Sequence, residues 1–202
     1  NLPRIDYTGG EGHWLFEPQR TNLITYSEDF SQWVSDTNAS ITSNSIISPD
    51  GTLNADKLIA GSSVARQSIK FNLTASGNIS AYVFAKKGEY SVIQLTDAVL
   101  GAAFANFDLE NGVVGTQFAA VGSIESFGDG WYRCSIVYTA VSTSSNSHRI
   151  YTLDGDNDKT FSGDGVTINL YIYGASLEKL SYPTSYIPTQ GATSTRLQDI
   201  AT

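Results

Sequence analysis

The sequence predicts an all-β fold of about ten strands, either a two-sheet sandwich or a barrel, and three observations support this prediction. Apolar and polar residues alternate along most of the chain, in short segments rich in β-branched and aromatic side chains. Clusters of Gly, Asn, Asp and Ser separate these segments at spacings of roughly 8–12 residues. No window shows the sustained periodicity and the capping residues of a helix.

The expected strands follow from this alternation in chain order. The first four are Arg20–Thr25, Ala39–Ile47, Ala55–Ala60 and Ala65–Leu73. The six clearest are Ile79–Lys86, Tyr90–Thr96, Phe104–Leu109, Trp131–Val141, His148–Leu153 and Thr167–Leu177. Asn111-Gly112 and Asp129-Gly130 are each expected to close a hairpin, because these residues reach positive φ at low cost. Pro49-Asp50-Gly51 is another expected turn, because proline presets its second position.

The composition excludes several classes of partner. Lys and Arg number 12 against 20 Asp and Glu, which gives a net charge of −8 over 202 residues. A chain of this length forms one domain, with or without tails. Its negative charge repels phosphate backbones and anionic lipid, so we expect no nucleic acid partner. The longest weakly apolar stretch, Ala98–Ala105, is far shorter than the roughly 20 residues that span a bilayer, so we expect no membrane insertion.

The residue types that often carry catalysis are few. Cys134 is the single cysteine and alternates with polar neighbours inside an expected strand, so we interpret it as a small buried apolar residue. His13 and His148 are the two histidines, and neither lies in a recognisable catalytic neighbourhood. We therefore expect a protein that is not an enzyme.

The two ends of the chain differ from its middle. The first residues are irregular and contain glycine, whereas the last carry Pro183, Pro188 and many Ser and Thr without any period. We expect an N-terminal arm or linker over residues 1–14, a β-sandwich module over 15–180 and a Pro/Thr-rich arm or linker over 181–202. Such arms would join neighbouring domains of a longer chain.

A series of short motifs lies between Leu15 and Arg196. The motifs are Glu17–Ile24 (EPQRTNLI), Tyr26–Trp33 (YSEDFSQW), Ser48–Gly51 (SPDG), Ala55–Leu58 (ADKL), Tyr82–Gly88 (YVFAKKG), Asp129–Cys134 (DGWYRC), Gly174–Glu178 (GASLE) and Pro183–Thr189 (PTSYIPT). Together they resemble a domain that recurs in phage virion proteins, especially tail fibres, and in some marine bacterial proteins.

The order of the segments is also similar to that of the jelly-roll carbohydrate-binding modules of the galactose-binding-like superfamily. This resemblance implies two antiparallel sheets, a concave face that holds sugars and a structural calcium ion near the ends of the domain. It places the chain in a virion or an extracellular protein. The implied partners are a glycan and neighbouring virion proteins or domains of the same chain.

Four residues are the candidate carbohydrate-binding site. By the same resemblance, Arg66, Gln94, Arg149 and Tyr151 fall on three strands that should line the concave face. Arg149 and Tyr151 share one side of a strand, because residues two apart point the same way. Arg and Gln offer paired hydrogen-bonding groups to adjacent hydroxyls, and Tyr offers a ring with a polar tip. The alternative is a solvated sheet face with cross-strand polar pairs.

The three tryptophans have two possible roles. Trp14, Trp33 and Trp131 are either platforms on which a sugar ring packs or aromatic residues of the core or its rim. Trp131 follows a Gly-Asp-Gly turn at the start of a strand, a position where an aromatic residue often closes the end of a sandwich.

Carboxylates supply the candidate metal ligands. The jelly-roll resemblance implies a calcium ion at Glu28, near the first strand, and Glu178, at the end of the last strand. Asp154, Asp156 and Asp158 alternate in a way that lets a loop wrap around a hard cation, but a mobile acidic loop is the simpler interpretation.

The predicted function is a non-catalytic module that binds carbohydrate on a concave sheet face. One alternative is a structural virion module that mediates protein–protein assembly through its arms. A third is a polysaccharide-active enzyme with paired carboxylates, because 20 acidic residues offer many pairs.

Overall fold

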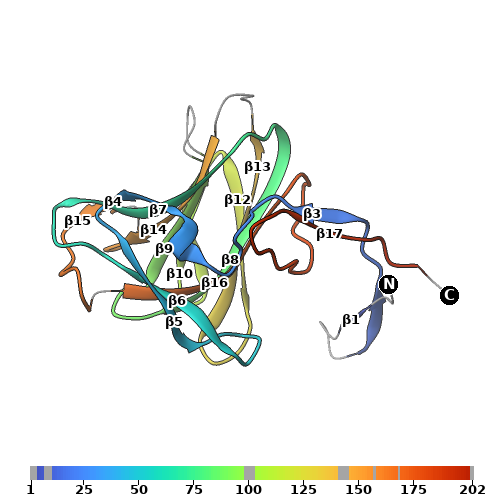
Figure 1. The fold of residues 1–202 in the computed structure, drawn as a ribbon, viewed down its shortest axis with the longest axis horizontal. Helices are drawn as coiled ribbons and strands as arrows, with labels where there is room; N and C mark the ends of the chain where they lie inside the picture. Colours follow the sequence, from blue (N-terminus) through green and yellow to red (C-terminus); the bar gives the residue numbers. More distant parts are fainter. Residues whose placement is uncertain are drawn as a thin grey trace.

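The computed structural model describes residues 4–6, 11–97, 103–140, 146–156, 158–167 and 169–200. Two antiparallel sheets pack face to face (Figure 1), which confirms the predicted two-sheet sandwich. One 3-10 helix, η1 (Phe30–Gln32), is the only helical element among the described residues. No helix in this part of the chain is long and apolar enough to cross a membrane.

The first sheet has seven strands. Their order is β11 (Val113–Phe118), β10 (Phe104–Asp108), β9 (Val92–Asp97), β14 (Asn146–Leu153), β7 (Ala65–Leu73) and β15 (Thr160–Phe161), and β4 (Val34–Thr37) also pairs with β7. The second sheet has six strands, in the order β12 (Ala120–Ser126), β13 (Trp131–Ala140), β8 (Gly77–Lys87), β16 (Asn169–Glu178), β6 (Leu53–Ile59) and β5 (Ser40–Ile47).

The core lies between the sheets and follows from the alternation in the sequence. Inward-facing positions of both sheets supply it, including Ile69, Ile93, Leu95 and Ile150 from the first sheet and Ala81, Val83, Ile136 and Leu170 from the second. Cys134 belongs to this core and is fully buried, as predicted. Burial raises the pKa of its thiol, so the reactive thiolate is disfavoured.

All ten predicted strands are present, and the structure adds seven that the sequence did not predict: β1, β2, β4, β11, β12, β15 and β17. β11 and β12 show the reason. Most of their residues are exposed or half-buried, and they contain Gly115 and Gly122 among Ser, Thr and Gln. An edge strand with little buried surface has no strong apolar alternation to reveal it.

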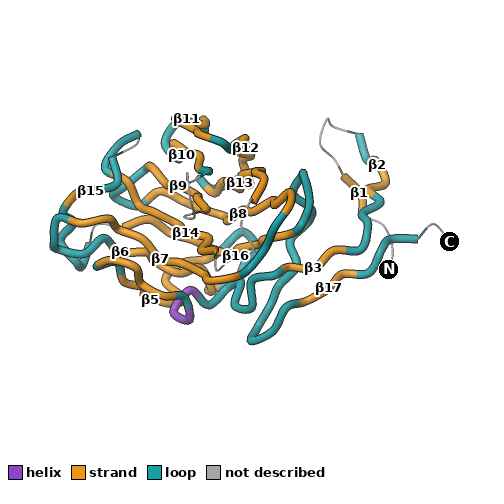
Figure 2. Tube along the Cα trace, turned by 90° about the horizontal axis from the view of Figure 1, so that it is seen from above, coloured by secondary structure: helices purple, strands orange, loops and turns teal. Residues whose placement is uncertain are grey.

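The chain ends contain short paired strands. β1 (Arg4–Asp6) pairs with β2 (His13–Leu15), and β3 (Arg20–Asn22) pairs with β17 (Ser194–Arg196). Figure 2 shows both pairs extending away from the sandwich on the side where the two termini lie.

Residues 184–190, by contrast, return to the sandwich. Thr184, Ile187 and Thr189 are buried there. The side-chain amide of Asn22 donates to the carbonyl oxygen of Ile187 at 2.9 Å, and the Ser185 N–H donates to the carboxylate of Glu17 at 2.8 Å. This segment therefore packs against the N-terminal part of the domain.

His148 lies in the core, and its burial is expected to make the stability of the protein depend on pH. It is 1% exposed, its ring packs edge-on against Trp33 at 6.3 Å, and neither ring nitrogen has a hydrogen-bond partner among the described residues. Burial lowers its pKa from 6.5 to about 4. The unfolded chain therefore binds this proton below pH 6.5, whereas the folded chain binds it only near pH 4, so stability falls as the pH drops through this window.

We expect this loss to reach about 2 kcal/mol between pH 8 and pH 5. His148→Leu should remove it, and urea unfolding of both proteins at the two pH values measures the difference. Asp56 and Glu178 have raised pKa values and act with the opposite sign, but they are common to both proteins and cancel in the comparison. Identical pH profiles for the two proteins would show that His148 contributes nothing.

Candidate functional site

The structure brings three of the four predicted carbohydrate-binding residues together on the outer face of the first sheet. Tyr151 and Gln94 are direct neighbours in the register of β14 and β9. Arg149 lies on the same side of β14, and its guanidinium donates to the Tyr151 hydroxyl at 3.2 Å. Arg66 shares this face but lies at its edge, opposite Thr160 of β15. Arg149 is half-buried and Arg66 is exposed.

A loop after β14 covers much of this face. The carboxylate of Asp156 accepts hydrogen bonds from the Asn106 amide at 2.7 Å and from the Thr116 hydroxyl at 2.7 Å. The ammonium of Lys159 lies 5.9 Å from the centre of the Tyr151 ring. Gln94 is fully buried and Tyr151 is 3% exposed, so neither presents a free surface to a sugar. Their role in binding stays a prediction.

The two carboxylates expected to hold calcium belong to separate networks. Glu28 accepts the hydroxyl of Tyr186 at 2.9 Å and that of Tyr173 at 3.3 Å. Glu178 is 1% exposed, and both of its oxygens accept the Thr184 hydroxyl. Among the described residues, no three His, Cys, Asp or Glu side chains form a group that could hold a metal ion. Calcium binding by these two residues stays a prediction.

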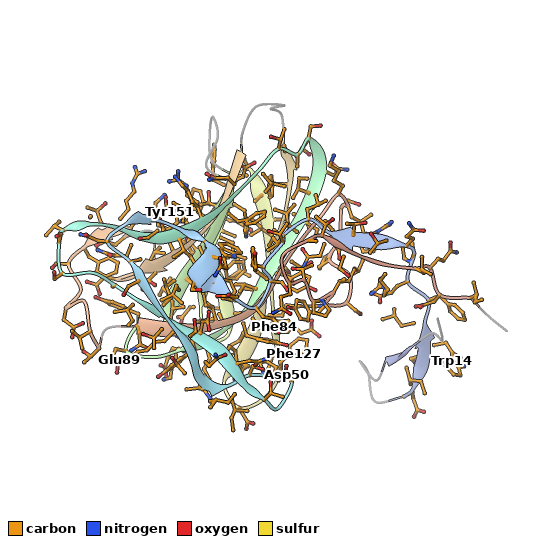
Figure 3. All side chains as sticks on the ribbon, in the orientation of Figure 1. Trp14, Asp50, Phe84, Glu89, Phe127 and Tyr151 are labelled. Atoms are coloured by element: carbon orange, nitrogen blue, oxygen red, sulfur yellow. The ribbon has the colours of Figure 1, made fainter. Side chains whose placement is uncertain are left out.

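The three tryptophans occupy different environments. Trp33 is buried and its indole N–H donates to the Tyr26 carbonyl at 2.9 Å, so it is a core residue. Trp14 is 64% exposed in the hairpin formed by β1 and β2, seen at the edge of Figure 3. Trp131 is 3% exposed and belongs to an aromatic cluster on the outer face of the second sheet.

This aromatic cluster is the most distinctive surface feature that the sequence did not predict. Outward-facing positions of β8, β13 and β16 supply its buried rings, which are Tyr82, Phe84, Trp131 and Tyr173. The Phe84 ring meets Phe127 edge-to-face at a centroid distance of 4.9 Å, and Figure 3 shows the two side by side near Asp50. The ring of Tyr186, from the C-terminal segment, also meets Phe84 edge-to-face, at a centroid distance of 6.2 Å.

A groove of about 890 Å³ opens beside this cluster, and we call it the aromatic groove. Its floor is formed by Lys86, Trp131 and Tyr171, its first wall by residues 46–53 of the turn between β5 and β6, and its second wall by residues 127–129 of the turn between β12 and β13. The volume lies in the range of roughly 300–1,000 Å³ that is usual for ligand sites.

Local sequence fixes both walls of the aromatic groove. In the first wall, the Asp50 carboxylate accepts from the Thr52 N–H at 2.7 Å and from the Tyr173 hydroxyl at 2.9 Å. Burial raises the pKa of Asp50, but its hydrogen bonds from Ser48 and Thr52 outweigh burial and hold the pKa well below its usual range. In the second wall, three consecutive residues from Gly128 to Gly130 have positive φ, which glycine tolerates at least cost.

Exposure is concentrated at the rim of the aromatic groove. Phe127 is 44% exposed, Ile47 and Leu53 are each 61% exposed, and Tyr171 and Lys86 are half-buried. Exposed apolar side chains grouped around a concave surface are typical of a binding site rather than of a random surface.

A second, acidic cleft of about 450 Å³ lies near η1 and bears on the enzymatic alternative. It is lined by Glu28, Asp29 and Asp56, and burial raises the pKa of Asp56 to about 6. However, Asp56 is 1% exposed, and its two oxygens accept the backbone N–H groups of Phe30 and Asn44, each at 3.0 Å. Asp56 thus holds two segments of backbone together and is not itself an accessible acid, whereas Glu28 and Asp29 in the same cleft are half-buried.

The fold and the aromatic groove define a β-sandwich with a ligand-sized surface groove. Comparison with known proteins adds little to this. No family model and no curated protein matches the chain. Among solved structures, the CBM22-2 xylan-binding domain of Paenibacillus barcinonensis Xyn10C is similar, with a TM-score of 0.42 and 14% sequence identity over 78% of this chain and 97% of that one. A likeness at this level implies no residue-by-residue correspondence.

Proposed function

We propose that this protein is a non-catalytic carbohydrate-binding module and that the aromatic groove is its glycan site. The observation that carries the proposal is the groove itself, in which exposed Phe127 and half-buried Tyr171 flank Lys86 in a concavity of about 890 Å³. The motif resemblance supports placing the module in a virion or an extracellular protein.

The chemistry of the aromatic groove suits sugar rings. One face of a pyranose consists largely of C–H groups and packs on a planar aromatic ring, while its hydroxyls need hydrogen-bonding partners. Phe127 and Tyr171 offer apolar ring surface, and Lys86 and Asp129 offer a donor and an acceptor. The β5–β6 turn is held by the hydrogen bonds of Asp50, so the groove needs little ordering when a glycan binds.

Alanine substitution of the rim tests this proposal. Phe127→Ala and Tyr171→Ala should each weaken glycan binding by about 1 kcal/mol, roughly fivefold in Kd, because each removes a ring surface. Calorimetry with oligosaccharides chosen from a glycan array measures the change. Phe118→Ala is the matched control, because Phe118 is 59% exposed on the first sheet.

The control variant should bind as wild type does. Equal losses of glycan affinity in the Phe118→Ala and Phe127→Ala variants would show that the aromatic groove is not the glycan site. An array on which no glycan binds at millimolar concentration would overturn the proposed function.

A second candidate function is assembly, and the β1–β2 hairpin favours it. Ile5, Trp14 and Phe16 are each about half-exposed or more, and an isolated two-stranded ribbon is marginally stable in water. A second copy of the chain is the partner that this surface fits, because both strand edges of the hairpin are open among the described residues. A wild-type oligomer in analytical ultracentrifugation that becomes monomeric in Trp14→Ser would support assembly, and a wild-type monomer would refute it.

A further inference from the structure

The floor of the aromatic groove lies on a row of alternating aromatic and cationic residues that continues beyond the groove to Lys57. In the strand register, Trp131 lies opposite Lys86, Lys86 lies opposite Tyr171, and Tyr171 lies opposite Lys57. These four positions form one row across β13, β8, β16 and β6. Lysine at two of the four positions is notable in a chain whose net charge is −8.

Lys86 has no counter-ion in the part of the chain that the structure describes. Two nearby cations do have one: Lys87 pairs with Glu110, and the Arg133 guanidinium pairs with Glu125 at 2.6 Å. A Cβ added at Gly130 would lie 3.7 Å from the Lys86 Cε, so the end of the lysine stem lies beside the turn that forms the second wall. The Lys86 ammonium in this ligand-sized groove can therefore pair with an anionic group of a bound ligand.

We propose that the glycan bound in the aromatic groove is acidic and that the Lys86 ammonium pairs with its carboxylate or sulfate group. This inference rests on the proposed function. A lysine acts on an anion as a point charge, so it recognises either group, and the rings of Trp131 and Tyr171 beside it restrict water around the pair. A neutral polysaccharide would leave this cation without an anionic partner.

One groove residue is expected to weaken the binding of an acidic glycan, and its substitution gives a second, independent test of the proposal. Asp129 lines the second wall at the tip of the β12–β13 turn and is exposed. Its carboxylate repels an anionic ligand. Removing the charge of Asp129 should therefore strengthen binding, whereas removing the charge of Lys86 should weaken it.

The experiment compares polygalacturonate with its fully methyl-esterified form, which has the same backbone without the charge, and with a sulfated galactan. Affinity electrophoresis and calorimetry are run at 50 mM and 500 mM NaCl. Lys86→Gln should weaken binding of an acidic polymer roughly tenfold. Asp129→Asn should strengthen it roughly twofold to threefold, and high salt should reduce both effects. The sulfated galactan shows which anionic group the groove prefers.

Lys87→Gln is the matched control. It changes the net charge of the protein by the same amount, but Lys87 points to the opposite face of β8 and pairs with Glu110. Equal losses in the Lys86 and Lys87 variants, or equal binding of the esterified and free polymers, would overturn the acidic ligand.

The failure of this inference is distinguishable from that of the proposed function. Binding of neutral polymers that Phe127→Ala weakens and Lys86→Gln leaves unchanged would leave a glycan site in place and refute only its charge preference. If no polymer of either kind binds, both proposals fail.

Discussion

Tyr151→Ala is expected to lower the free energy of unfolding by about 3–5 kcal/mol, the cost usual for truncation of a buried aromatic side chain. Tyr151 is 3% exposed beneath the loop that carries Asp156 and Lys159. Its hydroxyl also accepts a hydrogen bond from Arg149 at 3.2 Å. Urea unfolding measures the change, and calorimetry with a bound glycan shows whether affinity changes in the fraction that remains folded.

Tyr151→Phe and Arg149→Ala complete this test. Tyr151→Phe keeps the ring and should lose about 1 kcal/mol, because one hydrogen bond is removed. If the aromatic groove is the glycan site, both variants should bind as wild type does. If Tyr151→Ala has normal stability but loses glycan affinity, the side chain is not packed as described. The glycan site would then be the outer face of the first sheet, as the sequence predicted.

Asn22→Ala is expected to cost about 3–5 kcal/mol of stability, because it leaves several buried backbone groups without partners. The Asn22 amide donates to the carbonyls of Ala175 at 3.0 Å and Ile187 at 2.9 Å, and its oxygen accepts the N–H groups of Ile24 and Leu177, both at 3.1 Å. A single fully buried side chain thus joins β16 to both the N-terminal and the C-terminal segments.

Thermal and urea unfolding measure this effect, and Asn72→Ala serves as the control. Asn72 is exposed on β7, and its substitution should change stability by less than about 0.5 kcal/mol. Removal of residues 181–202 should be at least as damaging as Asn22→Ala, because it also removes the buried Thr184 and Ile187. An Asn22→Ala variant as stable as the control would show that these hydrogen bonds contribute little.

The sandwich was predictable from the sequence because strands with one face in the core must alternate apolar and polar residues. Segments such as Ile79–Lys86 and Trp131–Val141 place apolar residues on one side for the core, and the structure has strands at both. Edge strands such as β11 face solvent along much of their length, so nothing forces alternation on them. Alternation also placed Gln94 and Tyr151 correctly on one face but contains no information about the loop that covers them.

The aromatic groove was not predicted, because its parts are distant in the sequence. Its two walls come from separate hairpins, and only the register of β13, β8 and β16 brings Trp131 and Tyr171 next to Lys86. One signal was nevertheless present. Tyr82, Phe84 and Trp131 occupy the outward positions of strands whose inward positions already supply the core, and aromatic residues on both faces of a strand indicate a second packed surface.

The β3–β17 pair has a mechanical consequence. Tension on the two termini would load the hydrogen bonds between Glu17 and Asp199 before it reaches the outer end of this antiparallel pair, where Arg20 lies opposite Arg196. It would then break the hydrogen bonds of the pair one after another toward Asn22 and Ser194. Such unzipping needs little force, because each bond is loaded separately. It would then reach the four hydrogen bonds of Asn22, two of which, to Ala175 and Leu177, hold β16. The pair therefore acts as an extensible tether, and the groove would keep its shape while the tether lengthens.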